Sequence, residues 1–181
     1  IAIGTDAAAL GTDTIIIGRG SSTASTSATG CVALGAGIAI TSTTTNRVAI
    51  GTAVVCVGGG SIGIGNVATT AGTGSIAIGD TSSNTGTGPQ LAIGKNAATT
   101  GTRAIAIGGF SASNVLAAGT DSIAVGTDAQ VTAGIEAIVI GKGSTTAGNR
   151  SLVLGSGLTG AALTATIGGN AVTWLTASAS G

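Results

Sequence analysis

The sequence predicts an all-β solenoid in which short parallel strands stack turn upon turn. Three observations predict it: a phrase of aliphatic, small and aliphatic residues followed by glycine recurs along the chain, its copies are nearly evenly spaced, and glycine is abundant. Of 181 residues, 34 are glycine, one is Phe and one is Trp, and Tyr, Met and His are absent. Because a short, nearly fixed period indicates one structural unit per repeat, we expect a β-roll of about twelve short turns.

Each copy of the phrase predicts one strand that ends at a glycine corner. The copies are Ile1–Gly4, Ile15–Gly18, Val32–Gly35, Val48–Gly51, Ile62–Gly65, Ile76–Gly79, Leu91–Gly94, Ile105–Gly108, Ile123–Gly126, Ile138–Gly141, Leu152–Gly155 and the degenerate Ala165–Gly168. A period of about 14 residues has room for two strands and two corners, whereas a three-sided turn needs about 18. We therefore assign residues 1–168 to the β-roll, and residues 169–181, which lose the phrase, to a C-terminal cap or connector.

The residues of each phrase alternate between the two faces of the strand. We expect the first and third residues, which are large, to fill the roll and the small middle residue to face outward. No middle residue is charged, although a water-facing strand normally carries charged or large polar groups. The small column therefore predicts close approach by another surface, made by Ala2, Ala33, Ala49, Ala77, Ala92, Ala106 and Ala124.

The six basic and six acidic residues all lie within two residues of a phrase. Stacked turns should gather them into two mixed-sign columns of solvated corners with weak ion pairs. A formal net charge of zero gives no basic stripe for nucleic acid. No apolar run approaches the roughly 20 residues of a membrane span, so we expect no membrane insertion by this segment.

No catalytic set or metal motif is visible, because His and Tyr are absent and the acids fall on separate turns. We expect no enzyme activity and no cofactor. Cys31 and Cys56 are expected to be small buried fillers, and a disulfide between them stays open. A threonine ladder would indicate ice binding, but Ala8, Val115 and Gln130 interrupt it.

Two segments carry the family resemblance most clearly, Gly74–Ser82 (GSIAIGDTS) and Asp121–Ala129 (DSIAVGTDA). They resemble the head repeats of YadA-like trimeric autotransporter adhesins, and the resemblance extends from Ile1 to about Gly168. It implies a left-handed parallel β-roll and a homotrimer, with the alanine column at the trimer interface. It further implies adhesion to a host surface protein or glycan and display at the cell surface. Similar repeats occur in phage fibres.

We therefore expect a structural and adhesive fibre segment at an extracellular surface. The alternatives are a phage tail-fibre or other virion appendage, and a self-assembling extracellular filament whose copies join end to end. Something should cover the strand edge at Ile1–Gly4: more of the same chain, another domain or a neighbouring copy. The long spacer after Gly108 should bulge from the roll, and Phe110 and Asn114 within it are our candidate ligand contacts.

Overall fold

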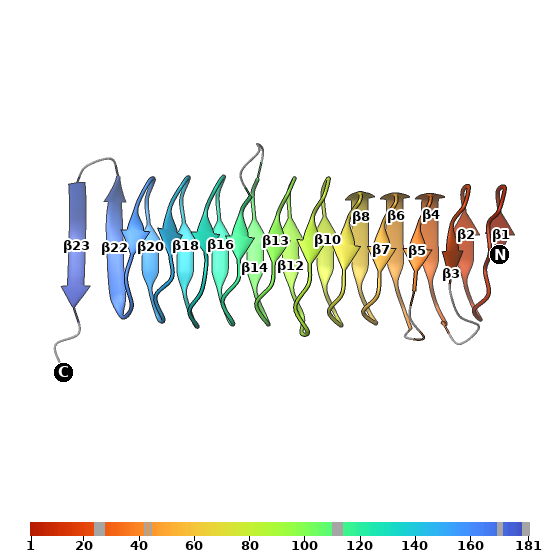
Figure 1. The fold of residues 1–181 in the computed structure, drawn as a ribbon, viewed down its shortest axis with the longest axis horizontal. Helices are drawn as coiled ribbons and strands as arrows, with labels where there is room; N and C mark the ends of the chain where they lie inside the picture. Colours follow the sequence, from red (N-terminus) through yellow and green to blue (C-terminus); the bar gives the residue numbers. More distant parts are fainter. Residues whose placement is uncertain (24–27, 42, 44, 110–113, 170–171, 179–181) are drawn as a thin grey trace.

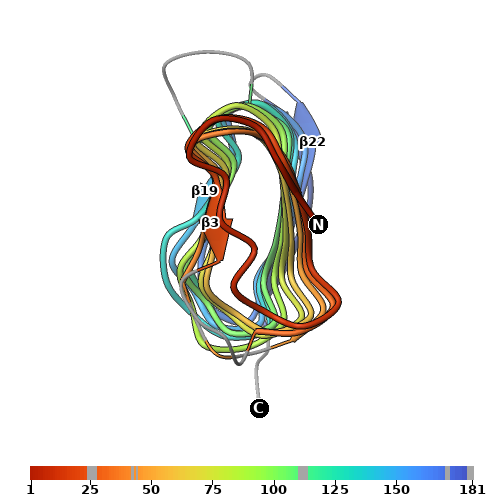
Figure 2. The same cartoon turned by 90° about the vertical axis from the view of Figure 1, so that its right-hand side faces the viewer.

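The computed structural model covers residues 1–181 and describes all of them except 24–27, 42, 44, 110–113, 170–171 and 179–181. The described residues form a rod of stacked turns, with β1 and β23 at opposite ends of the rod (Figure 1). Seen along the rod, the turns superpose in a flattened outline with two long sides (Figure 2). The predicted parallel β-solenoid is thereby confirmed.

Each long side is a β-sheet, and within the described residues the two sheets have 13 and 10 strands. The larger, sheet A, contains β1 (Ala2–Ile3), β2 (Ile15–Ile17), β4 (Val32–Ala36), β6 (Val48–Thr52), β8 (Ile62–Asn66), β10 (Ile76–Ile78), β12 (Leu91–Ile93), β14 (Ile105–Ile107), β16 (Ile123–Val125), β18 (Ile138–Ile140), β20 (Leu152–Leu154), β22 (Thr164–Gly169) and β23 (Val172–Ser178). Sheet B contains β3 (Ser22–Thr23), β5 (Ala39–Ile40), β7 (Val55–Cys56), β9 (Thr69–Thr70), β11 (Ser83–Asn84), β13 (Ala98–Thr99), β15 (Leu116–Ala117), β17 (Gln130–Val131), β19 (Thr145–Thr146) and β21 (Thr159–Gly160).

Every phrase of the sequence supplies one strand of sheet A, and the phrases pair in parallel with identical positions aligned. Ala77, for example, lies beside Gly63 of the preceding turn and Ala92 of the following turn. The spacers, although they differ in length, do not disturb this alignment: Ile105 and Ile123 are 18 residues apart and still pair. The repeat phrase therefore fixes the register, and the spacers absorb the variation in length.

The interior of the roll is narrow, and small residues fill it. In the strands from β2 to β20, the middle residue of each phrase points inward. The nine of these residues that have a side chain, from Ile16 to Val153, are 0% exposed in the single chain. Large and small residues alternate across the gap: a β-carbon on Gly160 of sheet B would collide with Cγ2 of Val153. Because the sheets lie this close together, most middle positions accept nothing larger than alanine.

The glycine that ends each phrase makes the predicted corner. Gly18 has φ of 141°, and a β-carbon there would collide with the carbonyl oxygen of Gly35 in the next turn. Only glycine combines this conformation with so close a contact between successive backbones.

The parallel ladder ends in an antiparallel hairpin. β22 pairs in parallel with β20 on one side and antiparallel with β23 on the other, with a register shift between Ile167 and Gly168. β23 therefore continues sheet A beyond the last phrase. The assignment of residues 169–181 to a cap or connector, separate from the roll, stays a prediction.

Candidate functional site

The outer face of sheet A carries two columns of large aliphatic side chains along the rod. They are the first and third residues of the phrases, which alternate with the buried middle residue and are half-buried or exposed in the single chain. The first column is Ile15, Val32, Val48, Ile62, Ile76, Leu91, Ile105, Ile123, Ile138 and Leu152. The second is Ile3, Ile17, Leu34, Ile50, Ile64, Ile78, Ile93, Ile107, Val125, Ile140 and Leu154. We call this surface the aliphatic face.

The alanines that we expected at a trimer interface lie on the opposite side of the sheet. Ala33, Ala49, Ala77, Ala92, Ala106 and Ala124 are all 0% exposed within one chain. Ala2, in the first turn, is exposed and pairs in register with the buried Ile16. The prediction was wrong about which face looks outward: the alanines are small because the roll is thin, and the flanking aliphatics do not fill it.

One sequence signal points to the correct face. The residue directly before a phrase shares the face of the middle residue, because two positions separate them. It is serine at Ser61 and Ser151, and both hydroxyls lie inside the roll, 3.0 Å from the hydroxyls of Thr70 and Thr146 respectively. Small polar residues that can pair with one another are suited to a thin interior, whereas isoleucine is suited to a surface that another chain covers.

Arg47 is a second departure from the expected pattern. We expected every charge at a solvated corner, but Arg47 directly precedes its phrase and is 0% exposed. Its Nη1 donates to the carbonyl oxygen of Cys56 at 3.5 Å. Burial lowers the pKa of the guanidinium, and the neighbouring thiols of Cys31 and Cys56 act in the opposite direction. Both cysteines are buried free thiols, so the prediction that they are buried fillers is confirmed.

Three pairs of the other corner charges form ion pairs between successive turns, as expected. Arg103 donates to both carboxylate oxygens of Asp121, at 2.5 and 2.6 Å. Arg150 pairs with Glu136 at 3.0 Å. These four residues all have positive φ, between 52° and 58°. These corners therefore hold charged side chains on a left-handed backbone, and each pair links two stacked turns.

The opposite edge of sheet A carries a smaller network. Asp80 accepts a hydrogen bond from the Asn66 amide at 2.9 Å and lies 3.4 Å from the Lys95 ammonium. These contacts hold the pKa of Asp80 below its usual range, and the hydrogen bond from Asn66 has the largest effect. The hydrogen bond from Arg103 does the same for the pKa of Asp121. All these carboxylates are exposed, so the contacts contribute little to stability.

The outward positions of the sheet B strands carry no charged residue. These positions, the outer face of sheet B, are the first residues of the two-residue strands: Ser22, Ala39, Val55, Thr69, Ser83, Ala98, Leu116, Gln130, Thr145 and Thr159. Threonine occupies only three of these ten positions, so the face does not offer the regular threonine ladder of an ice-binding surface. Apart from Val55, Leu116 and Gln130, the side chains of this face are no larger than threonine.

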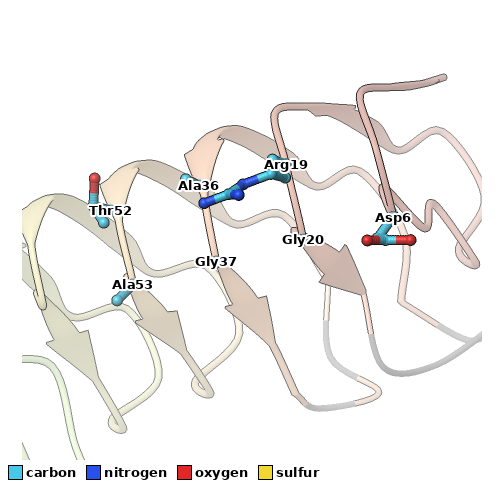
Figure 3. Close-up of a pocket in the computed structure, with 7 residues that line it drawn as sticks. All are labelled: Asp6, Arg19, Gly20, Ala36, Gly37, Thr52 and Ala53. Atoms are coloured by element: carbon cyan, nitrogen blue, oxygen red, sulfur yellow. The ribbon is translucent and has the colours of Figure 1, made fainter.

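An open hollow of about 420 Å³ runs along one corner of the first turns. It follows a row of small residues, Gly20, Gly37 and Ala53, and Figure 3 shows the Arg19 side chain reaching along it towards Ala36 and away from Asp6. Gly20 and Gly37 have φ of 63°, and Ala53 has φ of 52°. A left-handed backbone favours glycine at Gly20 and Gly37, and the hollow by itself does not indicate a ligand.

The predicted ligand contacts are only partly described. Asn114 is exposed and precedes β15, whereas Phe110 lies outside the described residues. Among the described residues, no group of three His, Cys, Asp or Glu side chains could hold a metal ion. The described part of the chain also has no helix that could span a membrane.

Stacked two-strand turns, one phrase per turn and glycine corners define this chain as a parallel β-solenoid repeat protein. The family model of the YadA head domain repeat, which spans two copies of the repeat, matches residues 57–82, 91–111, 117–134 and 133–157. The chain therefore carries YadA-like head repeats of trimeric autotransporter adhesins. This repeat family is a structural adhesin domain and not an enzyme family. No curated protein matches the chain.

Proposed function

We propose that the chain is a segment of a homotrimeric adhesin head that attaches its bearer to cells, matrix or another surface. The observation that carries the proposal is the aliphatic face. A sheet that looks onto water alternates apolar and polar side chains, but here the outward residues of sheet A are aliphatic in turn after turn. Continuous apolar surface of this extent marks a site of protein association.

The match to the YadA head repeat favours three copies as the assembly, because YadA-like heads form homotrimers. In such a trimer the three copies of sheet A face a common axis and bury their isoleucines against one another. Sheet B then looks outward on all three sides. The contacts in this interface are made by Ile76, Ile78 and their equivalents in the other turns, and not by the predicted alanine column.

The outward surface of the trimer is the proposed adhesive region. It comprises the uncharged face of sheet B and the spacer that contains Phe110 and Asn114. Small side chains on sheet B allow close contact with an extended protein or a glycan, and the longest spacer is the kind of insertion that repeat proteins often use for binding. We place this segment outside the cell, at its surface, and assign it no cofactor and no catalytic role.

A binding assay on the purified chain tests the adhesive role. We expect the protein to be retained on surfaces coated with extracellular-matrix proteins or on an array of cell-surface glycans. Substitution of Thr69→Lys with Ser83→Lys, on neighbouring strands of sheet B, should reduce retention while circular dichroism and particle mass stay unchanged. The matched control is Asp80→Ser, at a corner of sheet A. A folded particle that binds no matrix protein, glycan or cell would contradict adhesion by this segment.

A further inference from the structure

Two turns of the rod carry opposite charges at the two edges of sheet A. We define the leading corner as the residue two positions before a phrase, and the trailing corner as the residue directly after its glycine. In the turn of β2 these residues are Asp13 and Arg19, and in the turn of β18 they are Glu136 and Lys142. All four are exposed in the single chain. One such turn lies near each end of the rod (Figure 1).

The two corners of one turn cannot pair with each other within a chain. A strand of sheet A lies between them, and the three extended residues of β2 alone span about 10 Å. The ion pairs within the chain instead join neighbouring turns along one edge, as in Arg103 with Asp121. Among the ion pairs of the described residues, none includes Arg19 or Lys142. Each of these two cations is therefore available to a partner from outside its own chain.

Cyclic symmetry determines which corners meet when three rolls assemble. The operation rotates one protomer onto the next without moving it along the axis, so residues at one height meet residues at the same height. The interface is heterologous, because the leading edge of one sheet A faces the trailing edge of the next. The trimer therefore brings together the two corners of the same turn, taken from neighbouring protomers.

We propose that Asp13 pairs with Arg19 of the neighbouring protomer, and Glu136 with Lys142 of the neighbouring protomer, and that these pairs set the axial register of the trimer. The proposal rests on the trimer proposed above. The aliphatic face supplies the attraction, but its columns repeat every turn and cannot distinguish the aligned arrangement from one shifted by a turn. The corner charges can make that distinction.

A comparison of the aligned and shifted arrangements supports this role. In the aligned trimer the two opposite-charge pairs form, and every other charged corner faces a neutral one, as Arg103 faces Gly109 and Lys95 faces Pro89. At an interface shifted by one turn, so that each leading corner meets the trailing corner of the preceding turn of its neighbour, both attractions disappear. That shift also brings Arg103 against Lys95 and Arg150 against Lys142, which are like charges. A shift the other way leaves a single attraction, between Asp121 and Lys142. Exposed ion pairs are weak, but they select among arrangements that are otherwise equal.

Carbodiimide cross-linking of the unmodified protein tests the pairing, because it joins a carboxylate to an amine only when the two are in contact. We expect a covalent trimer on a denaturing gel, with Glu136 linked to Lys142 in the peptide spectrum. Lys142→Arg retains the charge but removes the amine, so its trimer mass should stay unchanged while this cross-link disappears. Lys95 provides an internal control, since its contact with Asp80 should give a link within one chain only.

Charge reversal tests whether the proposed pairs stabilise the trimer. Lys142→Glu places like charges at the seam and should raise the dissociation constant of the trimer about tenfold or more. The exchange Glu136→Lys with Lys142→Glu should recover most of that loss. A trimer by mass that gives no Glu136–Lys142 link would overturn the pairing and leave the trimer intact. A monomer by mass would overturn both proposals.

Discussion

A β-carbon on Gly63 would lie 2.7 Å from Cγ1 of Val54 and 3.0 Å from Sγ of Cys56. Gly63 is the middle residue of β8, at the position where the flanking strands have Ala49 and Ala77. Val54 and Cys56 take the space that the alanine methyl group fills in those turns. The glycine is therefore required by packing across the thin interior, since its own φ is not left-handed.

Gly63→Ala should destabilise the roll by about 1–3 kcal/mol, because the added methyl group overpacks a closed interior. Chemical denaturation followed by circular dichroism measures this loss. Val54→Ala places alanine where the next turn has Ala68. In the double variant it should make room for the added methyl group and recover part of the lost stability. Strictly additive effects of the two substitutions would show that these residues do not share one space.

Substitution by alanine should destabilise the roll by different amounts at the glycine that ends a phrase and at the glycine two residues after it. At Gly141, φ is 145° and a β-carbon would collide with the carbonyl oxygen of Gly155, so Gly141→Ala should prevent the turn from closing. Gly143 has φ of 63° and open space around it, so Gly143→Ala should cost only about 1–2 kcal/mol for the left-handed backbone. Thermal unfolding compares the two. Equal destabilisation would argue against the close backbone contact.

The pKa of Asp121 should depend on Arg103. The hydrogen bond from Arg103 lowers this pKa, so Arg103→Gln should raise it towards the ordinary value of an aspartate. A group with a lowered pKa in the folded state stabilises that state above its unfolded pKa, and loses the effect as the pH falls through its folded pKa. A carboxyl-carbon NMR titration measures the shift. An unchanged titration of Asp121 would mean that the ion pair does not persist in solution.

Inward and outward substitutions on one strand should have different consequences. Ala77→Arg forces a long charged chain into the interior and should unfold the roll itself. Ile78→Lys changes the aliphatic face and should leave a folded protein that no longer trimerises. Circular dichroism reports the fold and sedimentation reports the mass, with Asp80→Ser as the control that alters neither. If Ala77→Arg gave a folded monomer, that result would show that the alanine column, and not the aliphatic face, lies at the interface.

The sequence predicts the architecture of this chain better than the side of the sheet that each residue faces. The phrase and its glycine set the strands, the parallel register and the corners, and these follow from position alone. Strand alternation shows only that Ala77 and Ile76 lie on opposite faces, not which face is inside. The distance between the two sheets decides which face is inside. That distance depends on how sheet B packs against sheet A, through residues such as Val54 and Gly160 that lie across the interior.

Arg47 shows a second limit of the same kind. Most charges that precede a phrase stand two positions before it, on the outer corner, and Arg47 stands one position before it. That offset alone places it inside the roll, and the sequence contains this signal. The contact from Arg47 to the backbone of Cys56 depends on the three-dimensional packing and could not be foreseen.

The central claim is that the aliphatic face joins three chains, and sedimentation equilibrium tests it most directly. The purified protein should sediment as a particle of about 50 kDa, three times the 16.6 kDa of one chain. The double variant Ile64→Asp with Ile78→Asp, on adjacent turns of that face, should sediment at 16.6 kDa with its β-sheet spectrum retained. An unmodified protein that sediments as a single species at 16.6 kDa would contradict the account.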